Sequence, residues 1–194
     1  MFAIRNLLKN IMLIFFILLY SGFVNSPNDV EKVKDFTIND YLGNEHSLND
    51  YKDSKAIVII FIATRCPVSN AYNERMEKLF EDYKNKNVSF LGINSNKNED
   101  VTEIKEHAKK KNLTFTILKD NNNVVADMFG ASHTPEAYVL NSSFDVLYHG
   151  RIDNSQRESD ITSNDLRKAL DEILSGKKVS NPRTKAFGCS IKRI

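Results

Sequence analysis

The chain has 194 residues, 41% of them hydrophobic, with 27 basic and 25 acidic residues and a net charge of +2. This length and composition suit one globular domain with a hydrophobic core, once a short leader is set aside. The charge gives no reason to expect a nucleic-acid partner, because the lysines of residues 105–111 alternate with Glu103 and Glu106 as on a solvated helix face.

Residues 1–26 indicate an export signal. Arg5 and Lys9 precede an uncharged apolar run, and no basic residue follows until Lys32. The positive end should stay in the cytoplasm while the rest crosses the membrane. The run is shorter than the ~20 apolar residues of a full transmembrane helix, and Pro27 is unfavourable for cleavage just before it. A cleaved signal and a membrane anchor therefore both fit. Either predicts a domain in the bacterial periplasm or on the extracytoplasmic face, with the membrane as a partner if the segment is retained.

The first predicted elements of the domain are a hairpin over residues 35–48, a strand over residues 56–62 and a helix over residues 68–83. The strand is an unbroken apolar, β-branched run, which is typical of a strand covered on both faces. Apolar residues then recur at helical spacing with polar residues between them, which predicts an amphipathic helix.

Further strands and helices alternate along the rest of the chain. The pattern predicts strands over residues 88–94, 115–118, 137–140 and 146–149, and helices over residues 101–111, 122–129 and 164–174. This order predicts an α/β sandwich with a central mixed β-sheet flanked by helices. It contains no internal repeat and no second domain. We therefore expect one domain over residues 27–176 and a C-terminal tail over residues 177–194.

Cys66 lies where the apolar strand gives way to the helix. Pro67 suits the first position of a helix, so Cys66 should lie at or beside the N-cap. There the free backbone N–H groups and the helix dipole favour a thiolate, and Arg65 adds a positive charge nearby. The pattern predicts a lowered pKa and attack by Cys66 on a disulfide sulfur or a peroxide oxygen. The alternative is an inert core cysteine.

Four motifs share a resemblance to one family. Phe-x-Ala-Thr-x-Cys-Pro-x-Ser at residues 61–69 resembles the active-site stretch of thioredoxin-like redoxins, in particular exported thiol-disulfide oxidoreductases that carry Cys-Pro-x-Cys. Residues 133–140 are similar to the family's cis-proline loop and following strand. Residues 148–153 and the ending Gly-Cys-Ser-Ile-Lys at residues 188–192 complete a pattern similar to a peroxiredoxin-like, AhpC/TSA-type branch. The resemblance covers residues 30 to 194 and implies a thioredoxin-like sandwich.

The resemblance also implies roles for individual residues. Cys66 takes the place of the attacking cysteine, and Ser69 takes the place of the resolving one. The Thr134-Pro135 bond is expected to be cis, facing the thiol and exposing backbone to an extended substrate. His133 either tunes the thiolate or is an exposed loop histidine. The residues expected to contact substrate are Arg65, Pro67, Ser69, Thr134 and Pro135.

Cys189 is the second of two cysteines and lies in the polar tail. Two cysteines in an exported protein predict a disulfide by number alone. The chain from Leu174 to Cys189 extends up to ~50 Å, which is long enough to reach Cys66. The pair is either a catalytic attacker and resolver or a static staple.

Three functions fit the sequence. The first is a thiol-disulfide oxidoreductase that acts on a protein or small-molecule disulfide, with Cys189 or an external thiol reductant completing the cycle. The second is a thiol peroxidase acting on a peroxide, although peroxiredoxins carry Pro-x-x-x-Thr-x-x-Cys where this chain has Ile59 and Ala63. The third is a non-catalytic module that binds extended peptides, with Ser69 marking the loss of redox cycling. No cofactor is expected, and no metal, because neither Cys-x-x-Cys nor Cys-x-x-x-Cys occurs.

Overall fold

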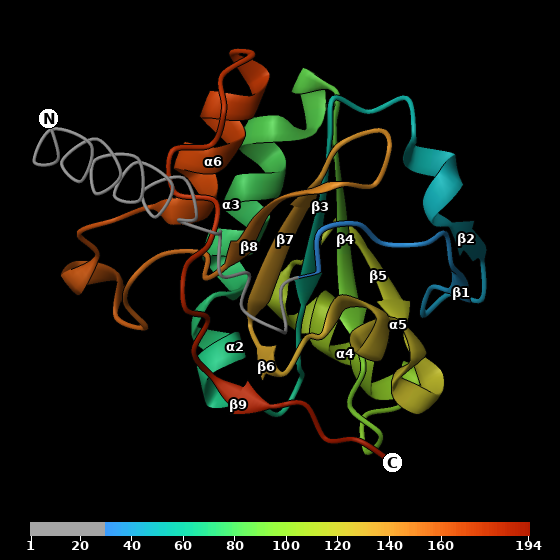
Figure 1. The fold of residues 1–194 in the computed structure, drawn as a ribbon. Coiled ribbons are helices and arrows are strands. Elements are labelled where there is room, and N and C mark those ends of the chain that lie inside the picture. The colour runs from blue at the N-terminus through green and yellow to red at the C-terminus, as the bar shows by residue number, and fades with distance from the viewer. Residues whose placement is uncertain (1–29) are drawn as a thin grey trace, which may run out of the picture.

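The computed structural model describes residues 30–194, so the predicted export signal lies outside the described residues. Within this part of the chain, no helix has both the length and the apolar character needed to cross a membrane. Its centre is a five-stranded sheet in the order β5-β4-β3-β7-β8 (Figure 1). The strands are β3 (Ala56–Phe61), β4 (Val88–Asn94), β5 (Thr116–Lys119), β7 (Glu136–Leu140) and β8 (Val146–Gly150).

The sheet is mixed, as the sequence predicts. β3, β4 and β5 are parallel, whereas β7 runs antiparallel to both β3 and β8. β3 is central and every residue in it is buried. Alternate side chains of a strand point to opposite faces, and each face of β3 packs into its own hydrophobic cluster. Burial on both faces explains why this stretch is an uninterrupted apolar run.

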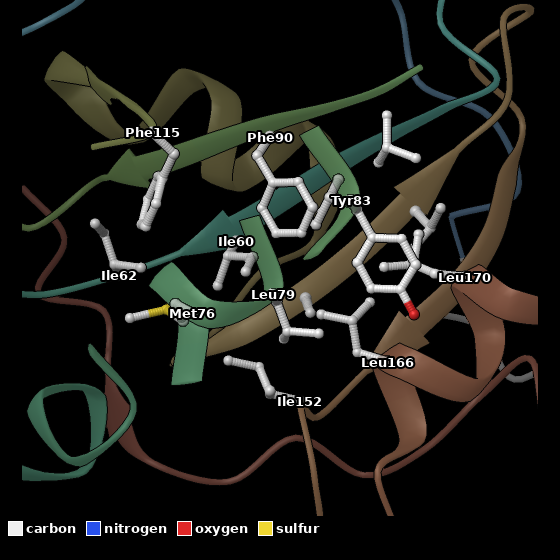
Figure 2. Close-up of a cluster of buried hydrophobic side chains, with 14 of the residues drawn as sticks. Ile60, Ile62, Met76, Leu79, Tyr83, Phe90, Phe115, Ile152, Leu166 and Leu170 are labelled. Carbon is white, nitrogen blue, oxygen red and sulfur yellow. The ribbon is translucent and has the colours of Figure 1, made fainter. Parts of the chain in front are cut away.

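Two helices follow β3, namely α2 (Pro67–Ala71) and α3 (Asn73–Tyr83), and α4 (Val101–Lys111) follows β4. The last helix of the described residues is α6 (Asp165–Leu174). Side chains from α3, α4 and α6 share one cluster with Val58 and Ile60 of β3. Figure 2 shows Met76 and Leu79 of α3 and Leu166 of α6 in this cluster, with Leu79 between the other two. The spacing of these residues places one apolar stripe of each helix on the core.

The opposite face of the sheet carries α5 (Val124–Phe129) and a hairpin of β1 (Thr37–Asn39) and β2 (Glu45–Ser47). Four aromatic rings meet edge to face in this cluster: those of Phe36, Phe61, Phe129 and Tyr138. The sheet is therefore covered on both sides. Four short 3-10 helices complete the described elements, and they are η1 (Leu48–Tyr51), η2 (Lys84–Lys86), η3 (Asn121–Asn123) and η4 (Glu158–Asp160).

Three parts of the chain differ from the predicted elements. The predicted helix over residues 122–129 starts only at Val124, because Asn122 and Asn123 have positive φ values of 65° and 61°. The predicted helix over residues 68–83 is two helices, because Tyr72 ends α2 and is the N-cap of α3. Two strands of two residues each were not predicted, β6 (His133–Thr134) and β9 (Cys189–Ser190), and they pair antiparallel with each other. Strands this short show no periodic pattern in a sequence.

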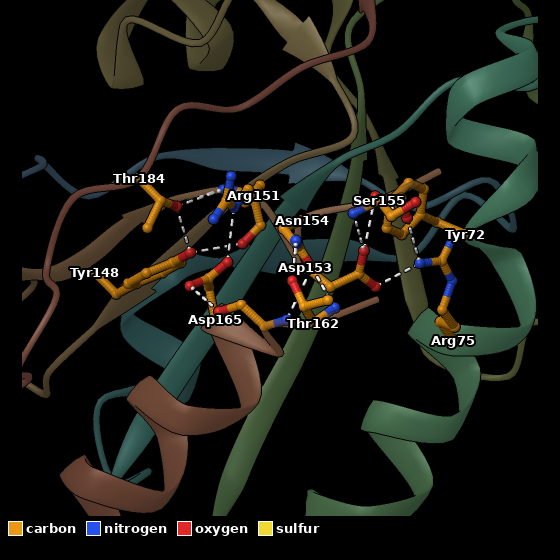
Figure 3. Close-up of polar contacts among 11 residues, drawn as sticks. Tyr72, Arg75, Tyr148, Arg151, Asp153, Asn154, Ser155, Thr162, Asp165 and Thr184 are labelled. Carbon is orange, nitrogen blue, oxygen red and sulfur yellow. Dashed lines mark hydrogen bonds and ion pairs between the residues drawn. The ribbon is translucent and has the colours of Figure 1, made fainter. Parts of the chain in front are cut away.

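The C-terminal tail packs on the domain from its start. The backbone N–H of His149 donates to the carbonyl of Pro182 at 3.0 Å, and the N–H of Thr184 donates to the carbonyl of His149 at 3.0 Å. Figure 3 shows the Thr184 hydroxyl between Tyr148, at 2.7 Å, and the backbone N–H of Arg151, at 3.0 Å. These contacts direct the tail along β8 and toward the start of α2.

Beside this contact, a buried carboxylate fastens the loop after β8 to α2 and α3. Asp153 accepts a hydrogen bond from the Tyr72 hydroxyl at 2.9 Å and pairs with Arg75 at 2.5 Å (Figure 3). The Tyr72 ring also meets the ring of Phe187 in the tail, with centroids 6.3 Å apart at an interplanar angle of 63°. Tyr72, at the end of α2, therefore contacts both the Asp153 carboxylate and the tail.

Candidate active site

Cys66 is the N-cap of α2, directly after β3 and its short connecting loop. Ser69 lies in the first turn of α2, where backbone N–H groups have no intrahelical acceptor, and its N–H donates to the Cys66 sulfur at 3.3 Å. The sulfur also lies 3.3 Å from the carbonyl oxygen of Thr134, to which the protonated thiol donates. The predicted position of the thiol at the helix N-terminus is confirmed, and only 5% of the residue is exposed.

The cis-proline loop faces this sulfur. The Thr134-Pro135 peptide bond is cis, as the resemblance implies. Thr134 is 1% exposed and belongs to β6, which pairs with β9 in the register Thr134↔Cys189 and His133↔Ser190. The tail therefore brings Cys189 to the residue whose carbonyl contacts Cys66. Both cysteines are free thiols.

The pKa values of the two thiols shift in opposite directions. Burial raises the pKa of Cys66, but hydrogen bonds from the Cys189 thiol, the Ser69 N–H and the Thr134 hydroxyl outweigh it, so the net pKa is lowered. The same hydrogen bond to Cys66 raises the pKa of Cys189, with burial and the charge of the Cys66 thiolate adding to it. The lowered pKa predicted for Cys66 is confirmed in direction. Of the two thiols, Cys66 therefore has the lowered pKa and Cys189 the raised one.

Gly188 allows the tail to lie this close. Its φ is +152°, and a Cβ atom built there would lie 2.1 Å from the carbonyl oxygen of Thr134. No side chain fits at that distance, and the conformation itself favours glycine. The glycine before Cys189 thus permits the contact between the tail and the cis-proline loop.

Arg65 lies beside Cys66 in sequence, but its guanidinium forms an ion pair with Glu103. Its guanidinium pairs with Glu103 of α4, with Nε 2.9 Å from Oε1, and the side chain is 62% exposed. The positive charge predicted next to the thiolate is therefore neutralised by a carboxylate. The hydrogen bonds described above, and not this cation, lower the pKa of Cys66.

Ser69 is fully buried, so its hydroxyl does not face a substrate. The hydroxyl oxygen accepts the backbone N–H of Ala63 at 3.1 Å, and the contact with Cys66 comes from the Ser69 backbone. His133 is 40% exposed at its side chain, and its ring lies 2.8 Å from the Ser132 hydroxyl.

Two buried carboxylates in the site were not predicted. Glu99 accepts the backbone N–H groups of Thr64 at 2.8 Å and Arg65 at 3.1 Å, and so shapes the loop before Cys66. Glu136 does the same for the cis-proline loop, accepting the N–H groups of Ser132 and His133 at 2.8 Å each. A signal existed for Glu99, since it lies in a polar run directly after a buried strand that is parallel to β3.

A cleft of about 250 Å³ opens beside the sulfur atoms. Both cysteines line it, together with Thr134, Asn96, Glu99 and Lys192. Residues 30–194 contain no cluster of three or more side chains placed to hold a metal ion. The chemistry that the described side chains offer at this cleft is that of two thiols, of which Cys66 has the lowered pKa.

Comparison with known proteins matches most of this chain to a family. The model of the AhpC/TSA family matches residues 30–155, so Cys189 lies beyond the matched stretch. The chain is similar to a hypothetical protein from Sinorhizobium meliloti 1021, with 32% identity and a TM-score of 0.80, over 88% of this chain and 97% of that one. A putative thiol:disulfide interchange protein DsbE from Chlorobium tepidum shares the fold at 19% identity and a TM-score of 0.62, over 77% of this chain and 99% of that one.

A curated relative adds a second similarity. The chain is 31% identical over 72 residues to a probable phospholipid hydroperoxide glutathione peroxidase from Mesembryanthemum crystallinum. The match covers 37% of this chain and 42% of the relative, so the chain spans less than half the length of that protein.

Proposed function

The chain belongs to the AhpC/TSA family, and from that premise we propose that it is a thiol-disulfide oxidoreductase in which Cys66 attacks and Cys189 resolves. The observation that carries the proposal is the pairing of β9 with β6, which places Cys189 opposite Thr134, the residue whose carbonyl contacts the Cys66 sulfur. The lower-pKa thiol is the N-cap of α2, and the higher-pKa thiol donates to it from the tail. Attack requires a thiolate, and the arrangement favours one on Cys66 alone.

In the first step, the Cys66 thiolate attacks one sulfur of a disulfide R–S–S–R. A bond forms between Cys66 and that sulfur, the original S–S bond breaks, and the other half leaves as a thiolate that takes up a proton. The product is a mixed disulfide on Cys66. The Ser69 N–H stabilises the negative charge on the sulfur before attack, because it points at that atom from the helix end.

In the second step, Cys189 attacks the Cys66 sulfur. Once Cys66 is in a mixed disulfide it carries no negative charge, so the main cause of the raised pKa of Cys189 is gone. Cys189 then loses its proton more readily, forms a Cys66-Cys189 disulfide and releases the second R–SH. An external dithiol returns both cysteines to thiols and is itself oxidised to a disulfide. The order of the two attacks follows from the charge of Cys66.

The experiment compares two variants with the intact protein, using cystine as the disulfide and a dithiol as the reductant. Cys66→Ser should abolish turnover, because a hydroxyl does not attack a disulfide. Cys189→Ser should retain the first step and accumulate a cysteine adduct on Cys66, visible as added mass. Equal turnover by Cys189→Ser and the intact protein, with no trapped adduct, would show that an external thiol resolves the intermediate.

The similarity to a plant glutathione peroxidase favours a second candidate, a thiol peroxidase. The Cys66 thiolate would attack one peroxide oxygen, giving a sulfenic acid and an alcohol or water, and Cys189 would then displace water to form the same disulfide. Ile59 is fully buried in the core, and Ala63 provides no hydroxyl. The Ser69 N–H, 3.3 Å from the Cys66 sulfur, is a backbone donor that remains at this place. Consumption of hydrogen peroxide at a rate matching that of cystine would favour this function, and a lack of reaction with both would favour a binding module.

We also propose an extracytoplasmic location. The charge pattern of residues 1–26 supports it, and the fold shared with a putative thiol:disulfide interchange protein agrees with it. A fusion to a reporter that is active only after export tests this proposal. Activity of the fusion is the expected result, and a reporter retained in the cytoplasm would refute it.

A further inference from the structure

We infer that β9 covers the backbone edge beside the thiol, so that Cys66 reacts with small disulfides and excludes disulfides carried on extended chains. The inference rests on the proposed function and deepens it by assigning a substrate class. In the thioredoxin-like fold, the residue before the cis proline offers its backbone to an extended substrate. In this chain the same edge already has a strand on it.

The strand that covers this edge, β9, pairs directly with the residues before the cis proline. β9 pairs with β6 in antiparallel register, with Cys189 opposite Thr134 and Ser190 opposite His133. The next residue continues the contact, because the N–H of Ile191 donates to the carbonyl of Ser132 at 3.0 Å. Figure 1 shows β9 beside β6 at the end of the sheet where α2 begins. A free strand edge is the usual template for an added chain, and this edge is occupied by the protein's own tail.

The contact leaves no room for a second chain between the tail and the loop. A Cβ atom at Gly188 would lie 2.1 Å from the carbonyl oxygen and 2.8 Å from the carbonyl carbon of Thr134. The backbone of the tail therefore touches the peptide unit that an extended substrate would use. A peptide can pair there only after the tail has moved away.

The end of the tail is fixed to the domain. Beyond β9, the Ile191 side chain is buried at 6% exposure. Polar contacts then hold the last three residues: Lys192 N–H to Asn96 Oδ1 at 2.8 Å, Lys97 N–H to the Lys192 carbonyl at 2.9 Å, Arg193 to Asp127 at 2.7 Å and Ile194 N–H to Asn123 Oδ1 at 3.1 Å. Displacement of the tail breaks several of these contacts together, and the tethered strand re-forms them at high effective concentration.

A small disulfide needs no such displacement. The cleft beside the sulfur atoms has a volume of about 250 Å³ and is lined by polar side chains, including those of Asn96, Glu99 and Lys192. Nδ2 of Asn96 is buried and has no hydrogen-bond partner among the described residues. A compact molecule with polar groups fits the opening, whereas an extended chain requires the covered edge.

The test uses two symmetrical disulfides that differ only in the length of chain they carry. One is cystine, and the other is a linear peptide dimerised through its single cysteine. All measurements are made in the Cys189→Ser background, so that each attack leaves a stable adduct on Cys66. The rate at which the Cys66 thiol is lost is divided by the rate of the same disulfide with free cysteine, which removes the intrinsic reactivity of each probe.

Gly188→Ala opens the edge, because its methyl group collides with the Thr134 carbonyl. Gly176→Ala is the matched control: its φ is also positive, at +71°, but a Cβ there meets nothing within 4 Å. A chain that ends at Gly188 is a second variant with the edge uncovered, for use if Gly188→Ala does not fold. It lacks residue 189, so it also has no second thiol and keeps the adduct on Cys66. With the tail in place, the normalised rate for cystine should exceed that for the peptide dimer by at least about tenfold, since displacing the tail breaks more than one hydrogen bond.

Either open form should raise the ratio of the peptide rate to the cystine rate by about tenfold, because loss of the donor at position 189 changes the Cys66 thiolate in the same way for both probes. Gly176→Ala should leave this ratio unchanged. The inference is overturned if the two probes react at equal normalised rates while the tail is intact, or if opening the edge leaves the ratio unchanged. Failure of Cys66 to react with both probes in every variant would instead refute the proposed function.

Discussion

Ser69 stands where related redoxins carry a second cysteine, and its two polar groups have separate partners. Its buried hydroxyl accepts the N–H of Ala63, and its backbone N–H donates to Cys66. Ser69→Ala should lower the free energy of unfolding by about 1–3 kcal/mol, because a buried N–H loses its acceptor. The pH dependence of Cys66 alkylation should stay in place, since the backbone donor remains. Urea unfolding and alkylation rates measure the two effects, and a large shift in alkylation would show that the hydroxyl acts on the thiolate.

Cys189 lies opposite Thr134, and hydrogen bonding from its thiol lowers the pKa of Cys66. Cys189→Ala should move the inflection of the Cys66 alkylation rate to higher pH, because a donor to the thiolate is lost. Cys189→Ser is the matched control, since the hydroxyl keeps a donor at the same place and should move the inflection less. An inflection that is the same in all three proteins would mean that the helix N-terminus alone sets the pKa.

The residues next to Cys66 show where sequence reasoning succeeded and where it stopped. The N-cap position followed from Pro67 and the end of the apolar run, which are local features. The pairing of Arg65 with Glu103 joins residues 38 positions apart. No local pattern indicates that this carboxylate takes the charge of the guanidinium. The same applies to Ser69, whose partners depend on how α2 meets the loop before it.

At the scale of elements, Glu136 at the start of β7 holds β6 in place. Burial raises its pKa, but hydrogen bonds from His149, Ser132 and His133 outweigh burial and hold the pKa below 4.5. A carboxyl with a lowered folded-state pKa stabilises the fold fully above its unfolded pKa and loses that contribution as the pH falls through the folded pKa.

Glu136→Gln should therefore lower the free energy of unfolding by about 1–3 kcal/mol at neutral pH, where charged hydrogen bonds are lost. The variant and the intact protein should converge as the pH falls below 4.5, because the intact carboxyl becomes protonated there. Urea unfolding across this range measures both effects. Glu106→Gln, at an exposed position of α4, is the control and should cost less than about 0.5 kcal/mol. A constant difference between Glu136→Gln and the intact protein at every pH would contradict the account.

The long elements could be predicted because their patterns are local. β4 and α4 have the predicted bounds, and β5 begins one residue later than predicted. β6 and β9 could not be predicted, since each has two residues and exists only because the other lies beside it. Their pairing requires Gly188 to lie against Thr134, and these two residues are far apart in the sequence. The sequence showed that the tail could reach the thiol, but the side of the site that it covers required the structure.

At the scale of the whole molecule, a Cys66-Cys189 disulfide would join the end of the central strand to the end of the chain and close most of the domain into one loop. Long loops gain the most from closure, so oxidation should raise the free energy of unfolding by about 2–4 kcal/mol. Urea unfolding of the oxidised and reduced protein measures this gain, with Cys189→Ser under the same two conditions as the control. An oxidised form less stable than the reduced one would show that the domain must distort to form the bond.

The central claim is that Cys66 attacks and Cys189 resolves within one molecule. The most direct measurement mixes the reduced intact protein with one equivalent of cystine, counts the free cysteine released and maps the disulfides. The account predicts two free cysteines per protein and a peptide containing Cys66 linked to Cys189, whereas Cys189→Ser should release one and keep the other on Cys66. Release of a single cysteine by the intact protein, with the second still bound to Cys66, would contradict it.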